Sequence, residues 1–304
     1  MSHTASDEQT LSSAAAMDAV TLHVGDLELM SSYYNQALAL APVEEIARGG
    51  QVHRVLGRGS VPMLRLVHTP DLPSVNPRDA GLFHTAFLFE SPAALAATVH
   101  RAASDSRSQF VGSSDHLVSE AFYFTDPEGN GIEVYRDRPR EKWEYRNGEL
   151  QMASYPLDPT EYLRRHLGDA PAGTPSAPGT VGHVHLQVGD VDQARAFYVE
   201  ALGFQTTVSS YPGALFAAAG GYHHHVAMNI WNSRGAGPRA ARLGLGDVAI
   251  SVPLREDLDA LAARLRARSI SHDDDGRRIA TRDPWGTQVT VALPGGTTEE
   301  LLAR

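Results

Sequence analysis

The chain repeats itself at a constant spacing, and this repeat restricts the folds open to it more than any other feature. Three pairs of equivalent residues are each 164 positions apart: Asp26 and Asp190, Tyr34 and Tyr198, and Leu38 and Leu202. In both copies an alternating β-type segment is followed by an aspartate suited to a helix N-cap and then by an amphipathic helical pattern. A repeat of this length predicts two similar halves.

A second pair of segments divides each half again. The segments His84–Phe89 and Asp247–Val252 alternate as strands do, and Ala/Leu-rich helices are expected after them at about 92–103 and 254–268. Each then closes with Asp-Pro-X-Gly, at 126–129 and 283–286, followed by a β-rich run. The sequence therefore predicts an α+β chain of four βαβββ units, beginning near residues 17, 81, 181 and 245.

Composition shifts give the expected domain boundaries. We predict a flexible N-terminal tail over 1–16, a first domain over 17–137, a second domain over 181–294 and a C-terminal tail over 295–304. The intervening stretch, 138–180, contains a helical patch around Pro159–Leu167 and then a Pro/Gly/Ala-rich linker.

Charge and cysteine content exclude several classes of protein. The net charge is −10, and no Lys/Arg cluster suited to tracking phosphates is present, so nucleic acid is not expected as a partner. No apolar run is long enough for a membrane span, and we expect a cytoplasmic protein. There is no cysteine, so any metal must be held by His, Asp, Glu or Gln. The sequence leaves a homo-oligomer open.

The four-unit pattern resembles the vicinal oxygen chelate superfamily, which includes glyoxalase I, bleomycin-resistance proteins and extradiol dioxygenases. The resemblance covers nearly the whole chain outside the N-terminal tail and the linker. It implies that the units pair into curled, incomplete barrel-like sheets around a metal. The fold alone does not fix the reaction, because this architecture hosts several chemistries.

The resemblance also implies where metal ligands fall, namely in the first strand of each unit and the last strand of the even units. At these positions the middle two units carry His84, Glu133 and His183, whereas the outer two carry Ala19, Asp247 and Thr290. We therefore predict that unit two shares a sheet with unit three. Two histidines and one carboxylate are the donor set of non-haem Fe(II) oxygenases. His185, two residues from His183 on the same strand face, is a rival ligand.

Further catalytic groups are implied by two other segments. The run His223-His224-His225 is expected within a strand, where alternation places His223 and His225 on one face and His224 on the other. Extradiol dioxygenases resembling this chain use one histidine of such a pair as the acid/base, and we assign that part to His225, with His223 beside it. The resemblance makes His116 and Tyr123 candidates to hydrogen-bond the substrate oxygens.

The resemblance is strongest to two-domain bacterial catechol 2,3-dioxygenases. It implies an oxidoreductase of aromatic hydrocarbon catabolism that uses Fe(II) to insert both atoms of O₂ into catechol or a substituted catechol. Two alternatives remain open at this point. One is a glyoxalase-type metal isomerase, which would require a second carboxylate ligand, and the other is a non-catalytic drug-binding module.

Overall fold

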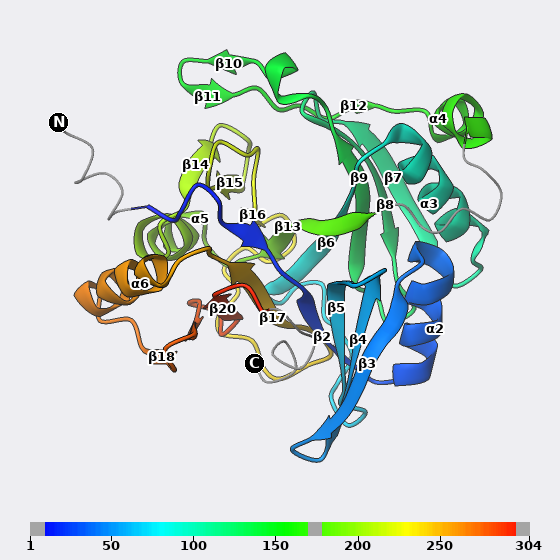
Figure 1. Cartoon of the computed structure of the whole chain (residues 1–304). Coiled ribbons are helices and arrows are strands. Elements are labelled where there is room, and N and C mark those ends of the chain that lie inside the picture. Colours follow the sequence, from blue (N-terminus) through cyan, green and yellow to red (C-terminus); the bar gives the residue numbers. More distant parts are fainter. Residues whose placement is uncertain (1–9, 170–177, 296–304) are drawn as a thin grey trace.

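The computed structural model describes residues 10–169 and 178–295 (Figure 1). Most of the predicted linker and C-terminal tail, and residues 1–9 of the predicted N-terminal tail, lie outside these ranges. Within them no helix has the length and apolar character needed to cross a bilayer.

The described residues form the four predicted βαβββ units. Unit one contains β2 (Val20–Val24), α2 (Leu27–Leu38), β3 (Ala41–Arg48), β4 (Gln51–Arg58) and β5 (Val61–His68). Unit two contains β6 (Gly81–Phe89), α3 (Pro92–Ser104), β7 (Gln109–Asp115), β8 (Ser119–Thr125) and β9 (Gly131–Asp137). Unit three contains β13 (Gly179–Gln187), α5 (Val191–Ala194) continued by π-helical turns (Arg195–Ala201), β14 (Gln205–Val208), β15 (Ala214–Ala218) and β16 (Val226–Asn229). Unit four contains β17 (Gly244–Ser251), α6 (Arg255–Ala267), β18 (His272–Asp274), β19 (Arg278–Arg282) and β20 (Gln288–Ala292).

Side-chain caps explain where the helices of the repeat begin. The Asp26 carboxylate accepts a hydrogen bond from the Leu29 N–H, and the equivalent Asp190 accepts one from the Gln193 N–H. Helix α2 ends at Ala39, which adopts a left-handed conformation with φ of 56°. The predicted helix near Pro159 is also present, as α4 (Pro159–His166).

Apart from one two-stranded hairpin, the strands of the described residues form two nine-stranded sheets, and neither closes into a barrel. One sheet has the order β12-β7-β8-β9-β6-β13-β16-β15-β14, with β12 spanning Tyr155–Pro156. The other has the order β18-β19-β20-β17-β2-β5-β4-β3, with β1 (Ala16–Met17) added on β17. Units two and three thus share one sheet and units one and four the other, as the complementary loss of ligand residues predicted.

Buried tyrosine–aspartate hydrogen bonds join consecutive units within each half. The Tyr34 hydroxyl on α2 donates to Asp126 Oδ2 at 2.8 Å, and the Tyr198 hydroxyl donates to Asp283 Oδ2 at 3.0 Å. Both aspartates begin the Asp-Pro-X-Gly turns of the following unit. Burial raises the pKa of Asp126 to about 6, against the lowering effect of its hydrogen bonds from Asn130 and Tyr34.

The Tyr34→Phe variant should lose about 1–3 kcal/mol of unfolding free energy at pH 7.5, because a buried carboxylate loses a donor. Removing that donor should raise the folded-state pKa of Asp126 further above its unfolded value. The loss should therefore shrink when urea denaturation is repeated at about pH 5, roughly one unit below that pKa, where Asp126 is largely protonated in both folded proteins. Tyr33→Phe is the matched control, because the Tyr33 hydroxyl hydrogen-bonds to the Ser108 hydroxyl at 2.9 Å and not to a carboxylate. Equal losses for both variants at both pH values would contradict this account.

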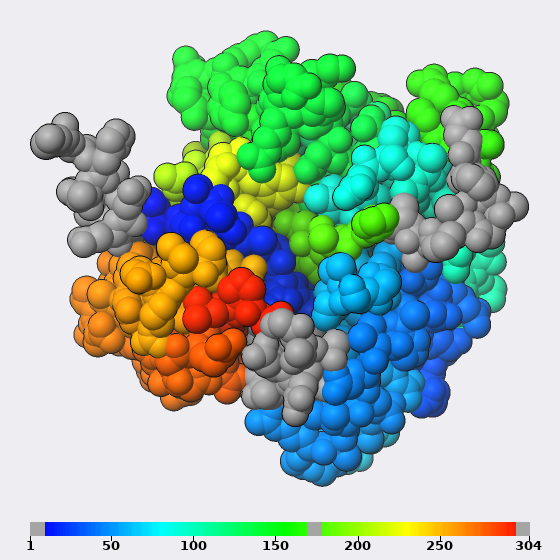
Figure 2. Space-filling view, viewed as in Figure 1, coloured from blue at the N-terminus to red at the C-terminus, as the bar shows by residue number. Residues whose placement is uncertain are grey.

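Residues 10–17 pack against the body of the protein, which corrects the expectation of a flexible tail up to residue 16. The Leu11 side chain is buried, and its N–H donates to the Gly203 carbonyl at 2.8 Å. Ala16 pairs with Ser251 in the antiparallel β1–β17 ladder. Figure 2 shows this segment, in dark blue, lying against both unit three (yellow) and unit four (orange).

Candidate metal centre

Three neighbouring strands bring His84, Glu133 and His183 to one point. Strand β6 lies between β9 and β13, so that Ala86 is paired with Glu133 on one side and with His183 on the other. Glu133 Oε2 lies 2.9 Å from His84 Nε2 and 3.2 Å from His183 Nε2. One potential ligand atom from each of the three residues lies within 4.8 Å of the other two, and all three side chains are buried.

The electrostatics of this cluster leave it ready to bind a cation. Burial alone would raise the pKa of Glu133, but the neighbouring His183 and His84 hold it well below its usual range. Burial lowers the pKa of His183 to about 4, although Glu133 acts in the opposite direction. At neutral pH the cluster therefore presents an ionised carboxylate and a neutral His183 imidazole, the protonation states that metal ligation requires.

The donor set and the unsatisfied His84 nitrogen fit a divalent transition metal. His84 Nε2 is buried and lies 2.9 Å from Glu133 Oε2 without the geometry of a hydrogen bond, so this contact leaves the nitrogen lone pair unsatisfied unless a cation lies between the two groups. Two imidazoles and one carboxylate suit Fe(II) or a similar ion and leave further coordination positions open. Glu133 is the one carboxylate in the metal-binding clusters of the described residues, so a four-ligand glyoxalase-type set with a second carboxylate is not assembled there.

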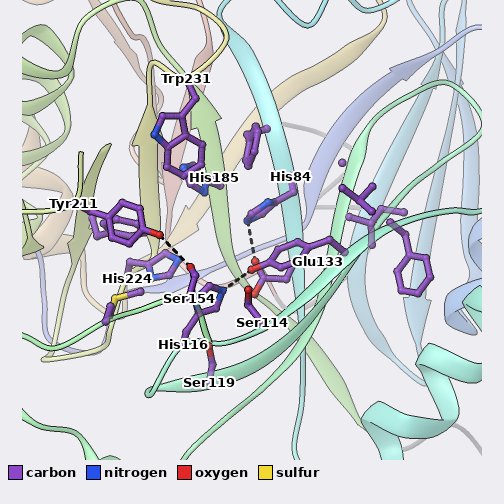
Figure 3. A pocket seen from close by; sticks show the side chains of 18 of the residues that line it. His84, Ser114, His116, Ser119, Glu133, Ser154, His185, Tyr211, His224 and Trp231 are labelled. Atoms are coloured by element: carbon purple, nitrogen blue, oxygen red, sulfur yellow. Dashed lines mark hydrogen bonds and ion pairs between the residues drawn. The ribbon is translucent and has the colours of Figure 1, made fainter. Parts of the chain in front are cut away.

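The cluster opens onto a cavity of about 460 Å³, a volume typical of small-molecule sites. Figure 3 shows His84 and Glu133 on its wall, with Trp231 and His185 on one side and His116 and Ser154 on another. The wall is largely apolar, and its hydrophobic side chains come from Phe83, Val111, Phe124, Ile132, Met152, Phe216 and Trp231. A planar aromatic molecule is the kind of ligand that such a wall accommodates.

His116 and Tyr123, predicted to contact substrate, both line this cavity and are joined by a hydrogen bond. His116 Nδ1 lies 2.6 Å from the Ala153 carbonyl oxygen, so it must carry the proton and donate. His116 Nε2, 2.7 Å from the Tyr123 hydroxyl, is then the acceptor of the tyrosine proton. The Tyr123 oxygen keeps lone pairs that can accept a hydrogen bond from a bound hydroxyl group.

The histidine run differs from its expected conformation. Strand β16 begins only at Val226, because Gly220 and Gly221, with φ of 59° and 67°, turn the chain just before the run. His224, and not His223 or His225, lines the cavity, and its ring centroid is 4.0 Å from that of His183.

The other two histidines of the run point elsewhere. His225 Nδ1 accepts a hydrogen bond from the Ala219 N–H, and its ring packs on Tyr222. His223 is fully buried behind His224 and bonds to Asp137. The strand alternation that singled out His225 therefore does not apply to residues 223–225, and the geometry favours His224 as the group that can reach a ligand.

Several cavity residues were not predicted from the sequence. Met152, Ala153 and Ser154 belong to a segment predicted only as part of the 138–180 connection. This segment includes the hairpin of β10 (Tyr145–Arg146) and β11 (Glu149–Leu150) and crosses to unit three, where the Glu149 carboxylate accepts from the Ser209 and Ser210 N–H groups. The segment is mostly charged and polar, so no pattern in the sequence marks Met152, Ala153 and Ser154 as cavity residues.

Two of the ligand positions of the outer units, Asp247 and Thr290, lie in the second sheet, where the Thr290 hydroxyl donates to Asp247 Oδ1 at 3.0 Å. The third, Ala19, is buried in the short connection between β1 and β2. His185 lies opposite His84 in the β6–β13 ladder, but it is not part of the metal-binding clusters found among the described residues.

The sequence model of the Glyoxalase/Bleomycin resistance protein/Dioxygenase superfamily matches residues 16–134 and 180–297, and the chain belongs to this superfamily. Within it, the chain is similar to the catechol-2,3-dioxygenase of Bacillus subtilis (strain 168), with 37% identity over 218 residues, covering 70% of this chain and 75% of that protein. This relative confirms the resemblance inferred from the repeat and supports the prediction of an oxidoreductase of the catechol 2,3-dioxygenase-like kind.

Solved structures agree on the fold. A Bacillus subtilis structure, described only provisionally as a dioxygenase, matches with a TM-score of 0.63 at 12% identity, covering 97% of this chain and 91% of that one. Glyoxalase I from Zea mays matches with a TM-score of 0.56 at 14% identity, covering 95% of each chain. At these identities the matches establish the architecture and not the reaction.

Proposed function

We propose that this chain is an extradiol dioxygenase that cleaves the ring of catechol or a substituted catechol beside its two hydroxyl groups, inserting both atoms of O₂. The observation that carries the proposal is the convergence of His84, Glu133 and His183 beside an aromatic-lined cavity, with His84 and Glu133 in its wall. The fold alone does not indicate the reaction, because the superfamily hosts several. The similarity to a catechol-2,3-dioxygenase therefore supports the proposal beyond what the fold does.

We assign the metal to His84, Glu133 and His183, and Fe(II) is the ion that this donor set favours. Fe(II), when bound, would offer adjacent positions to a catechol and to O₂ and acidify the catechol hydroxyls. The protein would hold the substrate ring between the apolar walls and exclude water from it. Orientation of this kind is a major part of what an enzyme contributes to such a reaction.

His224 is the residue we assign to proton transfer, and its hydrogen bonds explain why it can act as a base. His223 Nε2 donates to Asp137 Oδ1 at 2.9 Å, so in the neutral ring His223 Nδ1 is an acceptor. His224 Nδ1 lies 2.7 Å from His223 Nδ1 and must donate to it. His224 Nε2 is thereby left with a free lone pair in a residue that lines the cavity.

The environment of His224 keeps that lone pair available. Burial lowers the pKa of His224 well below its usual range, so the ring is neutral at neutral pH. His183, His223 and His224 also have nitrogens within 4.8 Å of one another. We do not assign the metal to these three, because the His223–His224 contact is a hydrogen bond and the set lacks a carboxylate.

Tyr123 is assigned to positioning the substrate. Burial, reinforced by Glu133, raises the pKa of Tyr123 well above its usual range, so the phenol stays protonated. The Tyr123 hydroxyl donates its hydrogen bond to His116 Nε2, so the Tyr123 oxygen can accept a hydrogen bond from a catechol hydroxyl. This would hold the hydroxyl near the metal ligands until the proton leaves.

The proposed function is tested by loading the purified protein with Fe(II) under anaerobic conditions and then measuring O₂ consumption with catechol. We expect oxygen uptake together with a yellow, ring-opened hydroxymuconic semialdehyde. Loading with Mn(II) in parallel identifies the preferred ion. Metal-dependent isomerisation of a hemithioacetal without oxygen uptake would instead support a glyoxalase-type function. A role in aromatic catabolism, a cytoplasmic location and any homo-oligomer stay predictions.

A further inference from the structure

His185 is a titratable side chain of the cavity wall to which the proposed mechanism assigns no role. It lines the cavity and is buried among rings, with centroids 5.0 Å from His84, 4.9 Å from Phe83 and 5.5 Å from Trp231. Figure 3 shows Trp231, His185 and His84 following one another along one side of the cavity. Since Trp231 is 46% exposed, His185 lies between the metal cluster and the solvent side of the wall.

A chain of hydrogen bonds fixes the tautomer of His185. The Trp231 backbone N–H can only donate, and it donates to Asn229 Oδ1 at 3.1 Å. The other end of that amide is therefore the NH₂ group, and it lies 2.9 Å from His185 Nε2. Because an amide nitrogen cannot accept, His185 Nε2 carries no proton, and the proton of the neutral ring is on Nδ1.

This arrangement is built into the buried part of the fold. Asn229 is the last residue of β16 and is fully buried. Its strand pairs in parallel with β13, which carries His185, so the amide and the imidazole are held together by the sheet itself. The structure gives Asn229 as the one hydrogen-bond partner of the His185 ring among the described residues. The Nδ1–H group is thus left as a preset donor beside the Phe83 and Trp231 rings.

We propose that His185 is a specificity-determining residue that donates a hydrogen bond from Nδ1 to a ring substituent of the substrate, and that the preferred substrates are catechols with an acceptor substituent such as a carbonyl group. Because the same cavity is taken to bind the catechol, this substrate class depends on the function proposed above. The cavity volume of about 460 Å³ leaves room for a substituent beyond the ring and its hydroxyl groups. An unpaired buried donor would disfavour purely apolar substituents at this place.

The test compares formyl-substituted with methyl-substituted catechols, each with the substituent at ring position 3 or 4. Dissociation constants are measured by anaerobic calorimetric titration of the Fe(II) holoenzyme, and kcat/KM is measured separately by oxygen uptake. The preference is the ratio of the values for the formyl and the methyl compound, taken separately for affinity and for kcat/KM. We divide the preference of each variant by that of the wild type, because this cancels the intrinsic difference between the two compounds. Three variants are compared: His185→Phe, Asn229→Leu and Trp231→Phe.

In His185→Phe the preference should fall roughly tenfold at one of the two ring positions, the size of one lost hydrogen bond. Asn229→Leu keeps the His185 imidazole but no longer fixes its tautomer, so this variant should lose part of the same preference. Trp231→Phe changes the cavity wall but leaves the His185 Nδ1–H donor in place, so the preference should be kept. The Trp231 indole N–H is not a competing donor to the substrate, because it donates to the Pro212 carbonyl. If His185→Phe does not fold, Asn229→Leu still gives a decisive answer.

The outcomes separate this proposal from the function on which it depends. Oxygen uptake with a preference that is unchanged in both His185→Phe and Asn229→Leu would overturn the role of His185 alone. An equal loss for formyl and methyl compounds would also overturn it, because His185 would then act on something common to all substrates. A binding preference that disappears in His185→Phe, in a protein that consumes no O₂ with any catechol, would support the role of His185 and overturn the proposed dioxygenase function.

Discussion

Replacing Glu133 with alanine should remove stoichiometric iron from the protein and reduce catechol-dependent oxygen uptake below detection. Glu133 is the one anionic member of the cluster, and its oxygen is the atom that both His84 and His183 approach. Without it, two imidazoles remain in a buried, largely apolar site, and since neither can carry a negative charge they cannot compensate the charge of a divalent ion. Iron is measured by colorimetric analysis after anaerobic loading, and folding is checked by circular dichroism.

The matched control for this variant is Glu120→Gln. Glu120 lies on β8, next to the strand that carries Glu133, but it faces away from the cluster and pairs with Arg136 at 2.7 Å and Arg138 at 3.0 Å. It should retain a full complement of iron and near wild-type oxygen uptake. Stoichiometric iron in a well-folded Glu133→Ala protein would show that the ion is held elsewhere.

The His224→Gln variant should keep its iron and bind catechol anaerobically, but lose turnover by a factor on the order of 10²–10⁴. The reason is that His224 Nε2 is the free lone pair that the Asp137–His223–His224 chain leaves at the cavity. Glutamine preserves much of the volume but cannot accept and return a proton. Steady-state oxygen uptake gives the loss in turnover, and an anaerobic titration separates it from a loss of binding.

His225→Gln serves as the comparison, because His225 belongs to the same run but does not line the cavity. It should retain most of the wild-type turnover. A large loss in His225→Gln with none in His224→Gln would return the acid/base role to the residue that strand alternation selects. Loss of iron in His224→Gln would instead make His224 a ligand.

The repeat carries most of the information about the fold, since it shows which segments are equivalent. The caps at Asp26 and Asp190, together with the Asp-Pro-X-Gly turns, locate the helices and strands. The arrangement of the sheets was predicted from the ligand positions that the resemblance implies, and not from periodicity. His84, Glu133 and His183 could share one site only if units two and three shared a sheet, which the β6–β13 ladder confirms.

What could not be predicted depends on contacts between distant segments. The histidine run was expected to follow the alternation of a strand, but Gly220 sits against the Ser13 backbone, where a Cβ would meet the carbonyl oxygen at 2.1 Å. That close approach by the N-terminal segment accompanies the turn that puts His224 in the cavity. Likewise, the tautomer of His185 is set by Asn229, and no local pattern links those two residues.

Mass spectrometry of the product formed from catechol and ¹⁸O₂ by the Fe(II)-loaded protein tests the central claim most directly. The account predicts a ring-opened semialdehyde, cleaved beside the two hydroxyl groups, in which both added oxygen atoms come from O₂. Solvent exchange at the aldehyde is controlled by rapid trapping of the product. A product cleaved between the two hydroxyl groups, or recovery of intact catechol from protein with a full complement of iron, would contradict it.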